Sequence, residues 1–502
     1  MAQRALPITT ALLVAGMVIL PVTAVLWRGG GPGALGPAEW AALRFTLWQA
    51  AVSAALSVAL AVPVARGLAR RTFPGRGTLI ALMGAPFILP VIVAILGLLA
   101  VFGGSGLVNR IGAPLGVPRL DIYGYHGVIL AHVFFNLPLA VRLLLQGWLD
   151  IPAERFRLAA ALDAPVWRVL EWPMLRRVCP GAFAVIFVIC LGSFAVALTL
   201  GGGPRATTVE LAIYQAFRFD FDLGKAATLA ALQLVLGLAA GAFALRVAPS
   251  GGFGIGLDRQ RDRWDGATPM ARAADGLWIT FAAAFLLLPL LSVAVAGLPG
   301  LAQMPAEVWS AAARSLALAL GATALTLALA LPLLTAPGET AALLGIAVSG
   351  LVLGTGYFLL LQPIIRPGDV ALPVTMLVNA LMALPFVIRI LRPGLESARA
   401  DYGRLAAALG LSGWRLWRIV YLPRLRRPLG FAAGLTAALS MGDLGVITLF
   451  ADGDNATLPL QIYRLMGSYQ MEAARAAALL LLVLSLGLFW GFDRGGRGHV
   501  AA

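Results

Sequence analysis

The chain contains twelve apolar stretches that are long enough to cross a lipid bilayer as helices. A helix rises 1.5 Å per residue, so about 20 apolar residues cross roughly 30 Å of hydrocarbon. Arg4 precedes the first stretch, as in a secretory signal, but the stretch is long and lacks a clear cleavage site, so we expect it to be retained. The stretches predict an all-α membrane protein with about twelve transmembrane helices, at residues 7–26, 45–65, 79–102, 126–147, 180–200, 226–246, 276–297, 310–334, 341–362, 371–391, 429–450 and 473–491.

The composition agrees with a membrane protein and excludes several other classes. Of the 502 residues, 60% are hydrophobic and only 12% are charged, whereas a soluble domain carries about 25% charged residues. The two cysteines and three histidines form no CxxC, HExxH or His-rich cluster. We therefore expect no metal site and no cofactor in this chain.

The arginines indicate an orientation. Most of the 38 Lys and Arg residues fall on one side of the predicted spans if both termini are cytoplasmic, and cytoplasmic loops collect these residues. We therefore predict that both termini are cytoplasmic, and we expect no nucleic-acid partner. The densest basic segments are 66–76 and 392–427. For the first of them, a role in topology or in contact with anionic lipid is the simplest interpretation.

The chain also contains an internal repeat. RLAAALDAPVWR starting at Arg157 recurs as RLAAALGLSGWR starting at Arg404, which pairs Trp167 with Trp414. Further along, the offset between matching residues grows by three, which indicates a small deletion in the first copy. Six spans separate the copies, so the repeats should be parallel and related by a pseudo-two-fold axis along the membrane normal. We predict repeats at 1–246 and 274–502, joined by a cytoplasmic linker at 247–273, and we expect their cores, at about 40–246 and 308–490, to superpose.

The repeated segment forms one long cytoplasmic loop in each half. Small residues there let another protein approach the backbone, and aromatic residues anchor an interface. A single copy could be a helix lying passively at the lipid headgroups, whereas two equivalent copies favour a pair of docking loops. The candidate docking residues are Arg157, Ala160, Asp163, Trp167, Arg404, Ala406, Ala407, Gly410, Trp414 and Pro423.

These loops resemble the signature loop of the permease subunits of type I binding-protein-dependent ABC importers. The signature reads EAA, three residues, Gly, nine residues, Ile-x-Leu-Pro. Ala406, Gly410 and Pro423 match it at the right spacing, although Arg404 replaces the usual Glu. In the first loop Asp163 replaces Gly and the proline arrives three residues early, which predicts a loop shorter by about one helical turn. The resemblance implies that each loop forms a coupling helix seated in a cleft of an ATPase subunit.

Three longer segments, 193–227, 401–425 and 438–474, resemble the fused permease of bacterial importers of thiamine and its phosphate esters. The fused ferric-iron permeases are the nearest alternative family. The resemblance implies an inner-membrane permease that works with two copies of an ABC ATPase and with a periplasmic thiamine-binding protein. A secondary transporter driven by an ion gradient is the alternative from another class, but few ionisable residues lie deep in the spans.

The chain itself has no nucleotide-binding motif. No segment matches the pattern GxxxxGK[ST], and the only lysine, Lys225, lies in an alanine-rich context. A P-loop needs its lysine for the β and γ phosphates. We therefore expect the chain not to be an enzyme, and we expect ATP and Mg²⁺ to bind a separate ATPase subunit.

Polar residues within the spans are candidates for the substrate path, because burying them is unfavourable. Asp443 lies near the middle of a span and aligns with Ser193 of the first half. It either caps a broken helix, pairs with an arginine or contacts a cationic substrate. The remaining candidates are Glu210, expected in a loop on the periplasmic side, and the repeat-related pair Tyr214 and Tyr463. We interpret His132 and Asn136 as helix-packing residues.

Overall fold

The computed structural model describes residues 2–29, 35–84, 86, 88–201, 203–247, 265–334 and 348–497. Every regular element within these ranges is helical. Eleven helical segments among them are long and apolar enough to cross a membrane. The chain is therefore an all-α, multi-pass membrane protein, as its sequence predicts.

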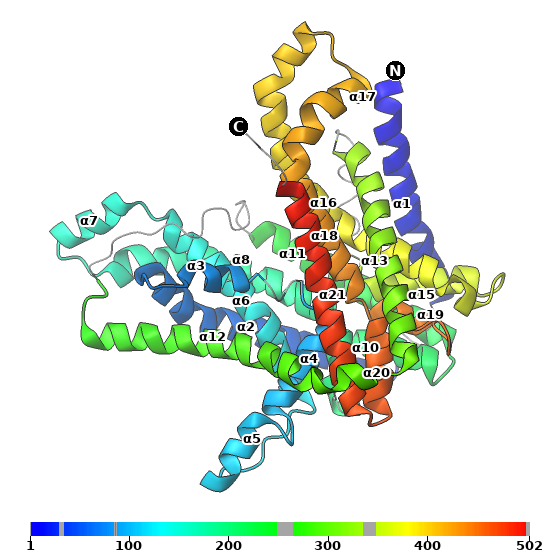
Figure 1. The fold of residues 1–502 in the computed structure, drawn as a ribbon, viewed down its shortest axis with the longest axis horizontal. Helices are drawn as coiled ribbons and strands as arrows, with labels where there is room; N and C mark the ends of the chain where they lie inside the picture. Colours follow the sequence, from blue (N-terminus) through cyan, green and yellow to red (C-terminus); the bar gives the residue numbers. More distant parts are fainter. Residues whose placement is uncertain are drawn as a thin grey trace.

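The two halves of the chain have matching series of helices (Figure 1). The first half comprises α1 (Ala2–Arg28), α2 (Pro37–Arg70), α3 (Arg76–Leu82), α4 (Val91–Phe102), α5 (Leu107–Gly112), α6 (Tyr125–Asp150), α7 (Ala153–Ala161), α8 (Trp172–Leu191), α9 (Ala195–Leu200), α10 (Val209–Arg218) and α11 (Leu223–Val247). The second half comprises α12 (Pro269–Gly297), α13 (Ala306–Leu333), α15 (Gly350–Leu361), α16 (Ala371–Ala408), α17 (Gly413–Leu416), α18 (Leu422–Met441), α19 (Gly445–Phe450), α20 (Leu458–Gly467) and α21 (Met471–Arg497).

Several predicted spans are not continuous helices. The spans predicted at 180–200 and 429–450 break at Gly192 and Gly442, between α8 and α9 and between α18 and α19. The span predicted at 79–102 is divided into α3 and the twelve-residue α4, whose N-cap is Pro90. Of the span predicted at 341–362, residues 341–347 lie outside the described residues and α15 is a twelve-residue helix. The linker predicted at 247–273 also lies mostly outside them, and its last five residues belong to α12.

The repeat seen in the sequence is matched by repeated contacts. Helices α8 and α18 each have 20 residues, and both follow a five-residue π-helical turn, Trp167–Glu171 in the first half and Trp417–Tyr421 in the second. The Val209 amide donates to the Thr46 hydroxyl at 2.9 Å, and the Leu458 amide donates to the Ser315 hydroxyl at 2.8 Å. Both bonds join the start of a short helix, α10 or α20, to a long helix, α2 or α13.

The first helix of each half packs against the other half. Helix α12 lies against α4, where a Cβ added at Gly97 would be 2.5 Å from the Pro289 carbonyl oxygen. Helix α1 lies against α15 in the same way, with Gly356 facing Pro21. The Tyr357 hydroxyl of α15 also donates to the Met17 carbonyl at 2.7 Å. The halves therefore exchange their first helices, and a glycine permits each close crossing.

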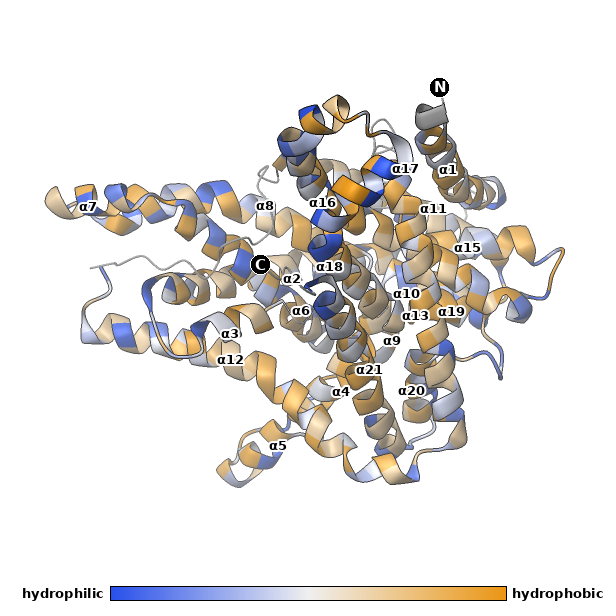
Figure 2. Ribbon diagram, turned by 45° about the horizontal axis from the view of Figure 1, so that its top comes forward, coloured by the Kyte–Doolittle hydropathy of each residue, from blue (hydrophilic) through white to orange (hydrophobic). Residues whose placement is uncertain are grey.

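Figure 1 shows how the halves meet. Helices α2, α6 and α12 run across the view, whereas α13, α18 and α21 run up it, and the two sets meet near α10 and α20. Helix α7 lies at the left edge and α17 at the top, so the two repeated loops are at separate extremities. Hydrophilic residues gather on α7 and near α17, whereas the long helices between are mostly hydrophobic (Figure 2).

Candidate functional site

The first repeated loop is built around α7. Helix α6 ends at Asp150, because Pro152 disfavours helical backbone at the residue before it. Helix α7 then ends in a Schellman motif: the Ala164 amide donates to the Ala159 carbonyl at 2.8 Å, and the Asp163 amide donates to the Ala160 carbonyl at 3.2 Å. Asp163 adopts a φ of 49°, a left-handed conformation that aspartate tolerates better than most residues.

The second loop ends its helix with the same motif. Helix α16 continues without a break into the loop, and the Leu411 amide donates to the Ala406 carbonyl at 2.9 Å. The Gly410 amide donates to the Ala407 carbonyl at 3.1 Å, and Gly410 has a φ of 64°. A Cβ at Gly410 would meet no atom within 4 Å. Gly410 is therefore required by its backbone conformation and not by crowding within the chain, and Asp163 fills the same role in the first loop.

The second loop is longer than the first by one helical turn. Helix α17 (Gly413–Leu416) has no equivalent in the first loop, and both copies then enter their π-helical turns, at Trp167 and Trp417. The structure thus pairs Trp167 with Trp417, and the sequence pairing with Trp414 is wrong. Trp414 belongs to the extra turn, where its side chain is 69% exposed.

The predicted docking residues are mostly at the surface. Arg157, Ala160, Asp163, Trp167, Arg404, Ala407, Gly410, Trp414 and Pro423 are exposed, and Ala406 is buried. Two repeated leucine pairs escaped the sequence analysis: Leu158 and Leu162 are 60% and 68% exposed, and Leu405 and Leu409 are 57% and 65% exposed. Each pair is spaced four residues apart, so both leucines lie on one helix face. Their recurrence within RLAAAL was the signal that could have revealed them.

An ion cluster supports the first loop only. The buried Glu171 carboxylate, in the π-helical turn, pairs with Arg66 at 2.8 Å and accepts a hydrogen bond from the Trp148 indole at 3.1 Å. Arg71 of α2 pairs with Asp275 of α12 at 2.6 Å. The position equivalent to Glu171 is Tyr421. Several arginines of segment 66–76 are therefore engaged within the chain, and the interpretation of this segment as a lipid or topology signal is incomplete.

The substrate-path candidates fall into two groups. Ser193 and Asp443 lie at the breaks after α8 and α18. The Ser193 hydroxyl is 2.6 Å from His132 Nε2, which agrees with a packing role for His132. Asp443 Oδ1 accepts the Gly445 amide at 3.1 Å, as expected for a cap at a broken helix, whereas Oδ2 is buried with no hydrogen-bond partner in the described part of the chain.

Glu210 is not in a solvated loop, as the sequence analysis expected. It lies in the first turn of α10 and is only 1% exposed. Burial raises the pKa of its carboxyl to about 7, and the Ser349 and Gln233 side chains beside it lower the pKa by a smaller amount. Tyr214 and Tyr463 lie on α10 and α20, and Tyr214 packs edge-on against Phe194 with ring centres 5.5 Å apart.

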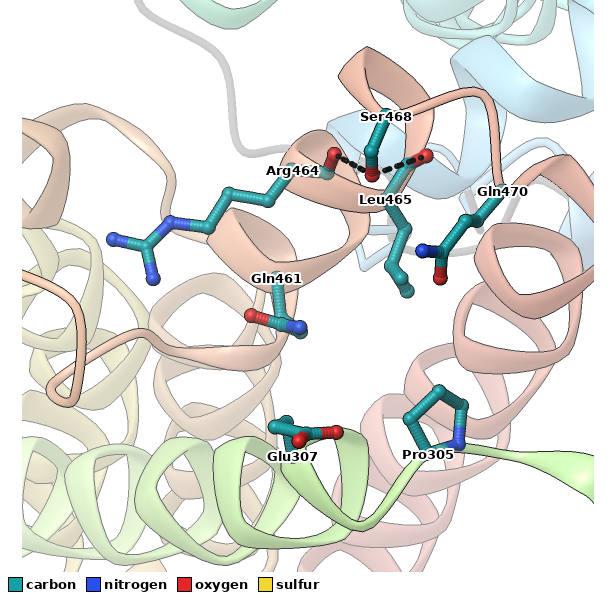
Figure 3. Close-up of a pocket in the computed structure, with 7 residues that line it drawn as sticks. All are labelled: Pro305, Glu307, Gln461, Arg464, Leu465, Ser468 and Gln470. Atoms are coloured by element: carbon teal, nitrogen blue, oxygen red, sulfur yellow. Dashed lines mark hydrogen bonds between the residues drawn. The ribbon is translucent and has the colours of Figure 1, made fainter.

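A shallow pocket of about 370 Å³ lies between the start of α13 and the end of α20 (Figure 3). Glu307, Gln461, Arg464 and Gln470 are among the side chains that line it. Arg464 does not reach into the pocket as a free charge, because its guanidinium donates to the Gly453 carbonyl at 2.9 Å and to the Asp452 carbonyl at 2.6 Å. The pocket includes none of the predicted site residues.

Comparison with known proteins gives the family. The chain is 39% identical over 525 residues to the thiamine transport system permease protein of Salmonella typhimurium, covering 97% of both chains. It belongs to the family of thiamine transport system permease proteins. The corresponding protein of Escherichia coli is 42% identical over 474 residues, covering 90% of this chain and 88% of its own, and that of Haemophilus influenzae is 34% identical over 506 residues, covering 94% of both. No family model matches the chain.

A shorter similarity agrees with the permease assignment. Over 117 residues, 23% of this chain and 40% of the relative, the chain is 33% identical to a sulfate transport system permease protein of Escherichia coli. The thiamine permeases match nearly the whole chain, whereas this relative matches only part of it. Both comparisons thus agree that the chain is a transport permease.

Proposed function

We propose that the chain is the membrane permease of an ATP-driven importer of thiamine, or of its phosphate esters, in the bacterial inner membrane. The observation that carries the proposal is the similarity to thiamine transport permeases along almost the whole chain. The proposed units are a first repeat at 1–246, with a core at about 40–246, and a second at 274–502, with a core at about 308–490. Both termini are proposed to be cytoplasmic.

The two repeated loops are the proposed contacts with the motor. Each ends a helix in the same left-handed turn and presents the same exposed pair of leucines, Leu158 and Leu162 or Leu405 and Leu409. An exposed apolar face beside a charged one fits a groove on a protein partner. One permease with two such loops would bind two copies of an ATPase, which would bind ATP and Mg²⁺, and the chain itself would not be an enzyme. A periplasmic thiamine-binding protein would deliver the substrate from the other side.

The breaks in the helices are the proposed substrate path. Non-helical backbone at membrane depth occurs where it is buried in protein or lines a route. The breaks at Ser193 and Asp443 come from both halves, and Tyr214, Tyr463 and Glu210 lie on the short helices that follow them. We assign these five residues to the path.

Transport in reconstituted vesicles tests the proposal. Vesicles would contain the permease and its ATPase, with the binding protein outside and ATP inside. We expect ATP-dependent uptake of radiolabelled thiamine and no uptake of ferric iron. Uptake of iron would assign the chain to the related iron importers, and thiamine uptake driven by an ion gradient without ATP would overturn the ABC mechanism.

A further inference from the structure

Three buried oxygen atoms of the first half accept no hydrogen bond within the described residues. They are Oε1 of Gln49 on α2, Oε1 of Glu210 on α10 and Oε1 of Gln233 on α11. The three residues are 0%, 1% and 3% exposed. Buried acceptors without donors are rare, because water that they lose is normally replaced by a protein partner.

The three side chains gather around the broken end of α8. The Gln49 amide donates to the Cys190 carbonyl at 2.9 Å, and the Gln233 amide donates to the next carbonyl, that of Leu191, at 3.0 Å. These bonds satisfy carbonyls that the end of a helix leaves open. They also fix which end of each amide is nitrogen, so the two Oε1 atoms must point away from the α8 carbonyls.

Glu210 joins this group from α10. Its carboxylate lies beside the Gln233 side chain and beside Ser349, the N-cap of α15 in the second half. The Gln233 and Ser349 side chains donate hydrogen bonds to this carboxyl group but carry no charge. A carboxylate in a low-dielectric interior is strongly unfavourable unless a positive charge or several donors compensate it. The cluster therefore offers a negative charge without a compensating cation and three Oε1 atoms without donors in the described residues.

The second half lacks every member of this cluster. The matching hydrogen bonds of Thr46 and Ser315 align Gln49 with Leu318, and the alignment of Thr208 with Thr457 places Pro459 opposite Glu210. On α21, the turn that corresponds to Gln233 is apolar (Leu481–Val483). A role in holding the broken helix would be needed in both halves. The break in the second half carries Asp443, whose Oδ2 is also buried without a partner in the described residues, but it has no counterpart of the two glutamines. This difference in acceptors between the halves points to a ligand.

We propose that the acceptor oxygens of Gln49, Glu210 and Gln233 recognise the positively charged, hydrogen-bond-donating part of the transported substrate. This inference rests on the proposed function: thiamine carries a cationic thiazolium ring and an amino group on its pyrimidine ring. The carboxylate of Glu210 compensates the charge, and the amide oxygens accept N–H bonds. Because Ser349 of the second half hydrogen-bonds to Glu210, the cluster lies where the two halves meet.

Uptake by the reconstituted importer tests the site. The rate for thiamine is compared with the rate for an analogue that has a carbonyl oxygen in place of the pyrimidine amino group. The same binding protein serves every variant, so a changed preference arises in the permease. Gln49→Leu and Gln233→Leu, which introduce the apolar character of the second half, should bring the ratio of the two rates towards one, because only thiamine has the amino group. Glu210→Gln should lower both rates about tenfold and leave their ratio unchanged, because both compounds carry the thiazolium cation. Glu39→Gln is the matched control, because Glu39 is paired with Lys225 at 2.8 Å, away from the cluster.

Each result decides the matter. In the two leucine variants, a merely structural role would lower both rates together and leave the ratio unchanged, which would overturn the assignment of the amide oxygens; unchanged rates for Glu210→Gln would overturn the assignment of the carboxylate. If Glu210→Gln does not assemble, the two leucine variants still measure the ratio. Replacing sodium in the assay buffer by choline tests whether the three oxygens bind an inorganic cation instead of the substrate. If thiamine uptake depends on sodium, the oxygens bind sodium and the substrate assignment is overturned. Failure of the unmodified importer to transport thiamine would instead refute the proposed function.

Discussion

Gly410 has two proposed roles: it shapes the second loop, and it contacts the ATPase. Substitutions by alanine and by tryptophan test these two roles separately. At a φ of 64° an alanine is strained by about 1 kcal/mol relative to glycine. No atom lies within 4 Å of the position of the new Cβ, so no steric term adds to that value. About 1 kcal/mol corresponds to roughly a fivefold smaller population of the native turn. Gly410→Ala should therefore weaken ATPase binding about fivefold.

A larger side chain at the same position measures the docking contact. Within the permease, Gly410→Trp has the same backbone strain as Gly410→Ala, since the space around the Cβ is open. If the ATPase approaches this turn closely, the tryptophan variant should bind far more weakly than the alanine variant. The measurement is the affinity of the purified ATPase for the detergent-solubilised permease, with uptake measured in parallel. Equal affinities of the two variants would refute the contact, and an unchanged affinity of Gly410→Ala would refute the strain argument.

The same comparison in the first loop tests whether the loops are equivalent. Asp163 already occupies the left-handed turn at a φ of 49°, so Asp163→Gly should relieve strain and preserve binding. The second loop has the extra turn α17 and lacks the ion cluster around Glu171. We therefore expect bulky substitution at Gly410 to impair uptake more than the matched substitution at Asp163. A larger loss at Asp163 would contradict this expectation.

Three further predictions follow from buried contacts. Gly97→Ala should destabilise the protein by about 1–3 kcal/mol through overpacking against α12, which a lower unfolding temperature in detergent would show. Gly16→Ala, where the Cβ has open space, is the control. Equal unfolding temperatures of the two variants would contradict the close crossing. Glu171→Gln should loosen the first loop, raising its hydrogen exchange while that of the second loop is unchanged; equal exchange in both loops argues against a local role. Thr46→Ala and Ser315→Ala each leave a buried amide without its acceptor, so each should lower the free energy of unfolding by about 1–3 kcal/mol. A large difference between the two losses would show that the repeated contacts are not equivalent.

The sequence predicts the spans and the repeat well because both depend on patterns that extend over many residues. Apolar length reveals a membrane helix, and the recurrence of RLAAAL at Arg157 and Arg404 reveals a repeat. The break after Gly192 was missed, and the break after Gly442 was considered only as one possible role of Asp443, because the apolar pattern continues through both into α9 and α19. Apolarity reports burial, and buried backbone can leave the helix where other groups of the protein satisfy it.

The functional residues were predicted less completely because their roles depend on distant partners. Glu210 reads as a loop carboxylate from its neighbours in sequence, and only the approach of Ser349 and Gln233 reveals that it is enclosed. In the sequence Asp163 departs from the family's glycine, although its φ of 49° shows that it makes the same turn. Trp167 was matched to the wrong tryptophan because a one-turn insertion between two similar residues cannot be located by identity alone.

The exchange of first helices between the halves has a consequence for biosynthesis. The hydrogen bond between Tyr357 and Met17 joins residues 340 positions apart, and ribosomes add about 5–20 residues per second. The first helix therefore remains in the bilayer for roughly 20–70 s before its partner is synthesised. During that interval its packing face is available to lipid or to an insertion chaperone. A ribosome that stalls within the linker would release a first half whose leading helix has no native neighbour on α15, so quality control can distinguish the truncated product from the complete permease.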